Sequence, residues 1–270
     1  MKKLITLTLA LGMISCTSAQ WGKRVKGNGD YVTIERSVGN YDGVALAGWF
    51  DIDLVSGNEG EITLEGESNL LEHIKTEVKD GKLVIKAEKG MNLRPSSWNK
   101  GIHITVPVES IEFVSLSGSG DVVGKTMIKS DRFNASMSGS GDVSLMVEAE
   151  EVEAALSGSG DINLSGRATD FTVSVSGSGD IKAYDLEADF VKATVSGSAD
   201  IKVTAHQSID ARVSGSGDIH YRGNPKKIKS KASTLSIEFE KNSDIVGRVI
   251  LDLFYIKNWS VLLDVKIIFS

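Results

Sequence analysis

Apolar and polar residues alternate with a period of two along much of the chain. Between residues 171 and 183, one phase carries Phe171, Val173 and Val175 and then continues through two glycines to isoleucine. The opposite phase carries only Thr, Ser, Asp and Lys. This period is that of extended chain with one row of side chains buried and one exposed. The pattern predicts short β-strands whose glycines lie on the inward row.

A repeated pentapeptide, Ser-Gly-Ser-Gly-Asp, organises this alternation. Successive copies are 18 to 21 residues apart, and the residues between them are apolar at regular places. A flexible Gly/Ser linker would lack those apolar positions, whereas self-similarity at a fixed period is typical of solenoids. Copies begin at Ser117, Ser138, Ser157, Ser176 and Ser214, and the variant Ser-Gly-Ser-Ala-Asp begins at Ser196.

The repeat length predicts the fold class. A unit of about twenty residues with two short strands cannot bury its own apolar row, so it must stack on neighbours about 4.8 Å away. No proline occurs between Ser110 and Asn224, as expected for strands paired on both sides. We expect an all-β chain, a right-handed parallel β-helix (β-solenoid) with coils of about 18–21 residues and its regular part at 111–233. Its predicted buried column is Val143, Ile162, Ile181, Ile201 and Ile219.

The inward glycines have two alternative explanations. A positive φ at a corner would require glycine, and so would a lack of room for a Cβ where coils turn tightly. Ala199 occupies the second glycine position of one copy. Because a positive φ would penalise alanine, crowding is the better account of that column.

The flanks of the array differ from it. Residues 31–110 are strand-rich but carry no pentapeptide, and they are predicted to be irregular N-terminal coils continuous with the solenoid. Within them, Asp80-Gly81 is a hairpin-turn signal, and residues 69–74 could form one helical turn. Residues 234–270 are an atypical C-terminal tail, because Thr234 and Leu235 replace the expected Gly-Ser-Gly. Two interpretations stay open, a terminal cap of further strands and a foreign tail.

Residues 1–19 have the layout of a secretory signal peptide. Lys2 and Lys3 precede an apolar stretch at 4–14 that is too short to span a bilayer, and small residues follow at 15–19. The sequence therefore predicts export to the periplasm, the outer membrane or cell surface, or the medium.

Two ways of processing this signal peptide are possible. Cleavage after Ala19 would release a soluble chain that begins at Gln20. Alternatively, Met13-Ile14-Ser15-Cys16 is a degenerate lipoprotein box and Cys16 is lipidated, in which case the lipid is the only expected membrane contact. A lipoprotein box normally has Leu where Met13 stands, which favours the soluble exit.

Charge and cysteine content exclude several classes. The formal net charge is −6, and removal of Lys2 and Lys3 leaves 28 basic against 36 acidic residues, or −8. This balance argues against a nucleic-acid partner and against electrostatic docking on anionic lipid. Cys16 is the only cysteine, so the mature chain has no disulfide.

The aspartates of the repeat are the candidate ligand face. In a solenoid they should stack in one outward column, where neighbouring charges about 4.8 Å apart repel by roughly 0.9 kcal/mol in water. Calcium between the coils would compensate this repulsion, but calcium-binding repeats are about half as long. Alternatively, each carboxylate accepts backbone or serine hydrogen bonds at a corner. The second interpretation is favoured, with no metal or cofactor. The column is Asp121, Asp142, Asp161, Asp180, Asp200 and Asp218.

Catalysis finds little support in the sequence. The four histidines are scattered and have no recognisable Ser/Asp partners or metal spacing. Polysaccharide-active β-helix enzymes need a cleft built by long insertions, and coil lengths here vary only between 18 and 21 residues. We therefore expect no enzyme. The alternatives are a calcium-binding solenoid and a polysaccharide-active β-helix enzyme.

Five further motifs precede the pentapeptide array. They are Tyr41-Asp42-Gly43-Val44, Gly48-Trp49-Phe50-Asp51-Ile52, Glu67-Ser68-Asn69-Leu70-Leu71, Val78-Lys79-Asp80-Gly81-Lys82-Leu83 and Ile104-Thr105-Val106-Pro107. In combination with the array they resemble a known family, that of the auto-transporter adhesin head GIN domain, which is common in Bacteroidetes. The resemblance covers roughly residues 38–233 and implies a right-handed β-helix, export and no established activity. From the outward columns of Ser and Asp we expect an adhesin-like binding or structural module that contacts a surface glycan or a protein.

Overall fold

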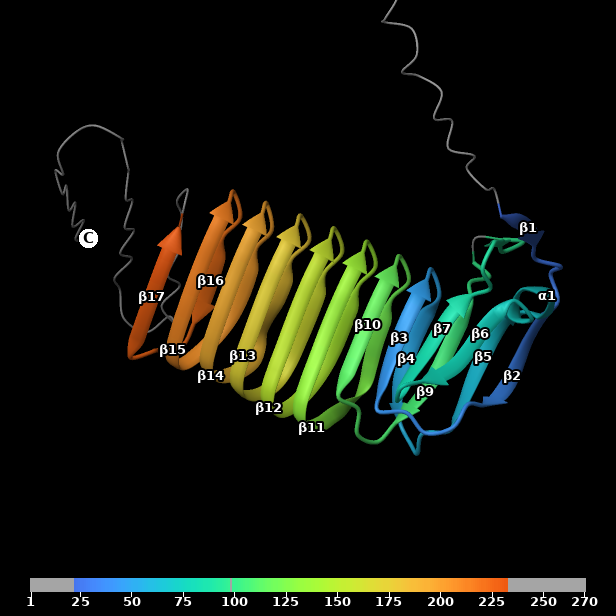
Figure 1. Ribbon diagram of the computed structural model, residues 1–270, viewed down its shortest axis with the longest axis horizontal. Helices are drawn as coiled ribbons and strands as arrows, with labels where there is room; N and C mark the ends of the chain where they lie inside the picture. The colour runs from blue at the N-terminus through green and yellow to red at the C-terminus, as the bar shows by residue number, and fades with distance from the viewer. Residues whose placement is uncertain (1–21, 98, 233–270) are drawn as a thin grey trace, which may run out of the picture.

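The computed structural model describes residues 22–97 and 99–232, which form a β-solenoid whose coils stack along one axis in two layers of strands (Figure 1). One fifteen-stranded sheet runs through the coils, and β1 and β8 form a separate two-stranded sheet. The elements are β1 (Lys23–Lys26), β2 (Tyr31–Ser37), β3 (Gly43–Gly48), β4 (Asp51–Ser56), β5 (Glu61–Glu67), α1 (Ser68–Leu71), β6 (Ile74–Lys79), β7 (Lys82–Ala87), β8 (Met91–Arg94), β9 (His103–Val108), β10 (Phe113–Gly118), β11 (Val122–Gly139), β12 (Val143–Gly158), β13 (Ile162–Gly177), β14 (Ile181–Gly197), β15 (Ile201–Gly215), β16 (Ile219–Arg222) and β17 (Lys227–Ala232).

The regular coils confirm the predicted architecture. Each of β11 to β15 is a strand of 15 to 18 residues that forms one coil apart from its corner, and each pairs in parallel with the next. The sequence pattern predicted two short strands per coil. Instead, each coil contains one long strand that bends midway. The strand is not interrupted because its hydrogen-bonded pairing with the next coil continues through most of the bend, as at Glu148↔Arg167.

The predicted isoleucine column is confirmed. Ile162, Ile181 and Ile201 are in register and fully buried. The column also extends beyond the regular coils, through Val122 and Ile52. The core is therefore a set of in-register apolar columns, each formed by one residue per coil.

The first regular coil stacks on a coil that the repeat pattern did not reveal. Strand β10 pairs with β3, so that Ser117 lies beside Ala47 and Gly118 beside Gly48, and β11 then pairs with β4. The segment Ala47-Gly48-Trp49-Phe50-Asp51 therefore occupies the place of a pentapeptide. In the sequence it looks unrelated because Trp49 and Phe50 replace Ser and Gly. Strands β5 to β9 lie between this coil and the next one along the chain.

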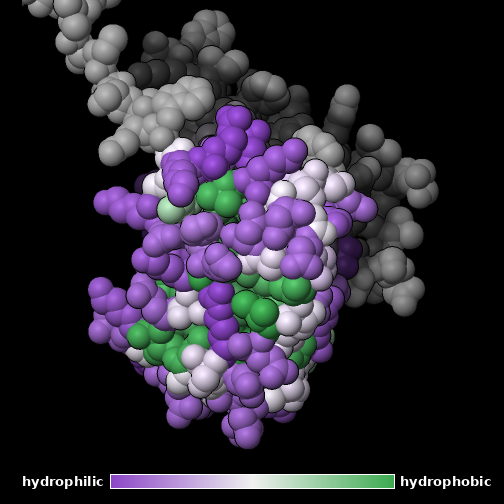
Figure 2. Space-filling view, turned by 90° about the vertical axis from the view of Figure 1, so that its right-hand side faces the viewer, coloured by the Kyte–Doolittle hydropathy of each residue, from purple (hydrophilic) through white to green (hydrophobic). Residues whose placement is uncertain are grey.

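Antiparallel strands close the N-terminal end. The β6–β7 hairpin is confirmed, with Asp80 and Gly81 at φ +50° and +75°, and α1 provides the expected short helical turn. Among the described residues, strand β2 pairs with β5 alone. Its Arg36 points inward, where Nη1 and Nη2 donate to the carbonyls of Ile74 and Leu71, both at 2.6 Å. An inward charge of this kind protects a sheet edge. Figure 2 shows this end largely covered by hydrophilic residues, with hydrophobic residues visible between them.

A buried carboxylate ties two loops to this end. Glu67 has no exposed surface, and its Oε1 and Oε2 accept hydrogen bonds from the backbone N–H groups of Gly29 and Ser96, at 2.6 and 2.8 Å. Burial alone would raise the pKa of Glu67, but the bonds from Ser96 and Gly29 and the charge of Lys100 outweigh it and lower the pKa.

Several predictions fall on residues outside the described ranges. These are the signal peptide at 1–19, the lipidation candidate Cys16 and the tail at 234–270. Within the described residues, no helix has the length and apolar character needed to cross a membrane.

Candidate binding faces of the solenoid

The aspartate column is a continuous hydrogen-bonded ladder. In each step the Oδ1 of one aspartate accepts a hydrogen bond from the backbone N–H of the aspartate one coil further on, at 2.9 to 3.1 Å. The six predicted aspartates are thus brought together, and Asp51 precedes them as a seventh member that sequence reasoning missed. Its signal was the Gly-x-x-Asp-Ile spacing in residues 48–52, which matches the repeat. The donors along the ladder are Asp121, Asp142, Asp161, Asp180, Asp200 and Asp218.

Backbone bonds run beside the ladder in the opposite direction. The N–H of Ile162 donates to the carbonyl of Asp180 at 2.9 Å, and equivalent bonds recur between the other coils. Each corner is therefore joined to the next by one side-chain bond and one backbone bond. The aspartate carboxylates thus accept hydrogen bonds from backbone N–H groups of the neighbouring coil. In an Asx turn, by contrast, the carboxylate accepts from a backbone N–H group of its own turn.

One lysine neutralises part of the column. The Nζ of Lys182 lies 2.6 Å from the Oδ2 of Asp161, in the preceding coil. Burial alone would raise the pKa of Asp161, but the bonds from Lys182 and from the Asp180 amide outweigh it and lower the pKa. At the C-terminal end of the column, Asp200, Asp218 and His220 each offer a ligand atom within 4.8 Å of the others. Hydrogen bonding already engages the Asp200 carboxylate, which accepts from the Asp218 amide.

The two glycine columns have different causes. At the first, exemplified by Gly139, φ is +147° and a Cβ would also overlap the Gly118 carbonyl. At the second, exemplified by Gly141, no left-handed φ occurs, but a Cβ would overlap the Gly120 carbonyl. Crowding therefore accounts for the second column, as predicted from Ala199. The first column needs glycine for both reasons.

The outward face next to these corners is formed by small polar side chains. The first serine of each pentapeptide is exposed and lies in register with the serine of the next coil. Because the repeat fixes both spacing and side-chain direction, these hydroxyls form a flat row along the axis. The row is Ser117, Ser138, Ser157, Ser176, Ser196 and Ser214.

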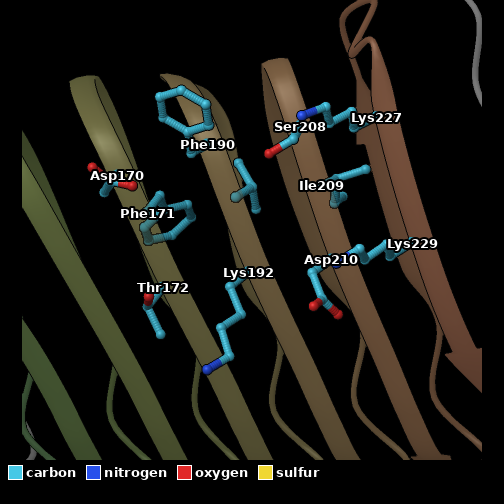
Figure 3. A pocket seen from close by; sticks show the side chains of 11 residues that line it. Asp170, Phe171, Thr172, Phe190, Lys192, Ser208, Ile209, Asp210, Lys227 and Lys229 are labelled. Atoms are coloured by element: carbon cyan, nitrogen blue, oxygen red, sulfur yellow. The ribbon is translucent and has the colours of Figure 1, made fainter.

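An open depression of about 370 Å³ lies on β13, β14, β15 and β17, near the bend of these coils (Figure 3). Phe190 stands in it with 45% of its surface exposed. The sequence analysis did not identify this exposed aromatic residue. The alternation of apolar and polar residues could have revealed it. Val191 belongs to the inward row, so its neighbour Phe190 must point outward.

The histidines lie apart. His73 contacts Glu88 at 3.2 Å, just outside the paired ends of β6 and β7, and His103 contacts Asp53 at 3.3 Å across β9 and β4. His206 contacts Glu187 one coil away. These are contacts of partly exposed side chains on the surface, of the kind that contributes little to stability.

The in-register coils, the glycine corners and the aspartate ladder define a parallel β-solenoid protein. Residues 40–225 match the family described as putative auto-transporter adhesin, head GIN domain, and the chain belongs to this family.

Solved structures show the same architecture. A structure described as a putative adhesin from Bacteroides fragilis superposes with a TM-score of 0.73 at 23% identity, covering 80% of this chain and 99% of the other. A structure described as a putative lipid binding protein from Parabacteroides distasonis gives 0.67 at 26% identity, covering 81% and 100%. A putative adhesin from Parabacteroides merdae gives 0.63 at 19% identity, covering 81% and 100%. No curated protein matches the chain.

Proposed function

We propose that the chain is an exported, non-catalytic binding module that contacts a glycan or a protein at a cell surface. The observation that carries this proposal is the row of exposed, in-register serines beside the hydrogen-bonded corners. A rigid face presents its hydroxyls without a further ordering cost, and repetition along the axis lets many weak contacts add up. Membership of the adhesin-like family agrees with this role.

Export follows from the signal-peptide pattern of residues 1–19. Intact-mass analysis of the native protein tests it. An N-terminus at Gln20 identifies the soluble form, and a lipidated Cys16 identifies the anchored form. Unprocessed Met1 in the cytoplasm would contradict both.

Binding is tested with the mature chain, residues 20–270, on an array of glycans, intact bacterial and host cells, and phospholipid vesicles. The vesicles are included because one similar structure is described as lipid binding. We expect saturable binding to a glycan or to a cell-surface protein. Binding to nothing on the array would contradict the proposal, and so would turnover of a polysaccharide.

A further inference from the structure

The depression at Phe190 combines an exposed aromatic ring with charged and hydroxyl side chains from four successive strands. Two outward rows line it. One runs through Asp170, Phe190, Ser208 and Lys227 and the other through Thr172, Lys192, Asp210 and Lys229 (Figure 3). At about 4.8 Å per coil, three intervals span roughly 14 Å. The depression is therefore wide enough for an extended ligand lying across the strands.

A local irregularity lies next to the ring. The β14–β15 register breaks between Ala188 and Phe190. Beneath the outward rows, Phe171, Val191 and Ile209 are buried and form a firm support. A single exposed apolar side chain is ordinary. This one differs because it stands inside a hollow whose other walls are charged.

Three lysines line the depression. Within the described residues, Lys192, Lys227 and Lys229 have no ion pair, whereas Asp210 is held by Arg212 at 3.1 and 3.2 Å. Figure 3 shows the amino groups of Lys227 and Lys229 directed toward the middle of the depression. The surrounding segment is basic as well, because residues 218–232 contain five Lys or Arg and one Asp, a net charge of +4 on a chain of net charge −6. This contrast favours an anionic ligand.

We propose that the depression binds an anionic glycan through the face of one sugar ring and its carboxylates. This inference rests on the proposed function and narrows it to one site and one ligand class. The Phe190 ring would stack on the C–H face of the sugar, because the negative face of an aromatic ring attracts the partial positive charge of C–H groups. Lys192, Lys227 and Lys229 would bind carboxylates. Asp170 has no ion pair within the described residues, and its carboxylate would accept hydrogen bonds from sugar hydroxyls.

The probe is an oligogalacturonate, and its fully methyl-esterified counterpart is the matched neutral ligand. Binding to the mature chain is measured by calorimetry at 50 and 200 mM salt. We expect Phe190→Ala to weaken binding at least tenfold, and a triple Gln variant at Lys192, Lys227 and Lys229 to abolish it. The ester should bind at least tenfold more weakly than the acid. Two controls match these changes, Met127→Ala at another exposed apolar residue and a triple Gln variant at Lys26, Lys79 and Lys89, which removes the same charge at the other end.

The outcomes separate the inference from the proposed function. If both controls bind like wild type and both depression variants are impaired, the inference holds. If the control triple loses as much affinity as the depression triple, binding follows net charge and the site is wrong. If the wild type does not bind the oligogalacturonate but binds a neutral glycan or a protein, the inference fails and the proposed function holds. If it binds only the vesicles, both the inference and the proposed function fail. If it binds nothing, both fail.

Discussion

The Oδ1 of Asp180 accepts a hydrogen bond from the backbone N–H of Asp200 at 2.9 Å, one coil further along the solenoid. Asparagine keeps a side-chain carbonyl at the same place and removes a charge from a column of carboxylates. We therefore expect Asp180→Asn to change the free energy of unfolding by less than about 0.5 kcal/mol. Asp180→Ala leaves the half-buried Asp200 amide unpaired and should cost about 1–3 kcal/mol. Urea denaturation of the two variants measures the difference, and equal costs would contradict the hydrogen-bond role.

Calcium should leave the ladder unaffected. Because the ladder carboxylates already accept backbone hydrogen bonds, we expect the melting temperature to be the same with 1 mM calcium and with a chelator. If the ladder held a calcium site, a calcium concentration of about 100 times its dissociation constant would raise the free energy of unfolding by roughly 2.7 kcal/mol. A calcium-dependent rise that Asp180→Asn abolishes would establish an ion site instead.

The two glycine columns should respond unequally to alanine. Gly177 has φ +147° and its Cβ would overlap the Gly158 carbonyl, whereas Gly179 faces only an overlap, with the Gly160 carbonyl. We expect Gly177→Ala to be more destabilising than Gly179→Ala by about 1–3 kcal/mol, the cost of a strained backbone conformation. Thermal unfolding of the two variants tests the order. The reverse order would show that crowding alone governs both columns.

Ile181 should tolerate a smaller apolar residue but no charge. It has no exposed surface and lies between Ile162 and Ile201. Ile181→Val should cost about 0.5–1.5 kcal/mol, while Ile181→Asp buries an unpaired carboxylate and should prevent folding of the array. The exposed Ser176→Asp is the control for added charge. Circular dichroism at neutral pH distinguishes these cases, and a folded, cooperative Ile181→Asp would contradict the buried column.

Stability at acid pH should depend on Glu67. Its pKa is lower in the folded chain than its usual value of 4.5. Its contribution is therefore complete above pH 4.5 and is lost as pH falls through the folded pKa. Glu67→Gln should be less stable than wild type at pH 7, because an amide cannot accept from both the Gly29 and Ser96 N–H groups. It should also lose less stability between pH 5 and pH 3.

Urea midpoints at pH 7, 5 and 3 measure this effect. The exposed Glu72→Gln removes one carboxylate without affecting either loop, and its curve should follow that of the wild type. A Glu67→Gln curve parallel to that of the wild type would mean that other carboxylates control the acid response.

Sequence by itself determined the repeating part of this protein. The pentapeptide period set the coil length, and the period-two alternation decided which side of each strand faces the core. Together they placed Ile162 and Ile181 in one buried column and Asp161 and Asp180 in one outward column. These features are local and repeated, so a single extended strand stacked on its own copies is sufficient to derive them.

Only the tertiary structure decided which distant segments join this stack. Asp51 begins the ladder because β10 stacks on β3 across about 70 residues of chain. The coil formed by β3 and β4 is hard to recognise in the sequence because Trp49 and Phe50 replace Ser and Gly of the repeat. The depression likewise needs the stacking of the last coils, in which Lys227 and Lys229 pair with Ser208 and Asp210 and so continue the rows that contain Phe190 and Lys192. The pairing of β10 with β3 depends on how the inserted strands β5 to β9 fold away between the two coils. A local alternation of apolar and polar residues carries no information about where such an insertion folds.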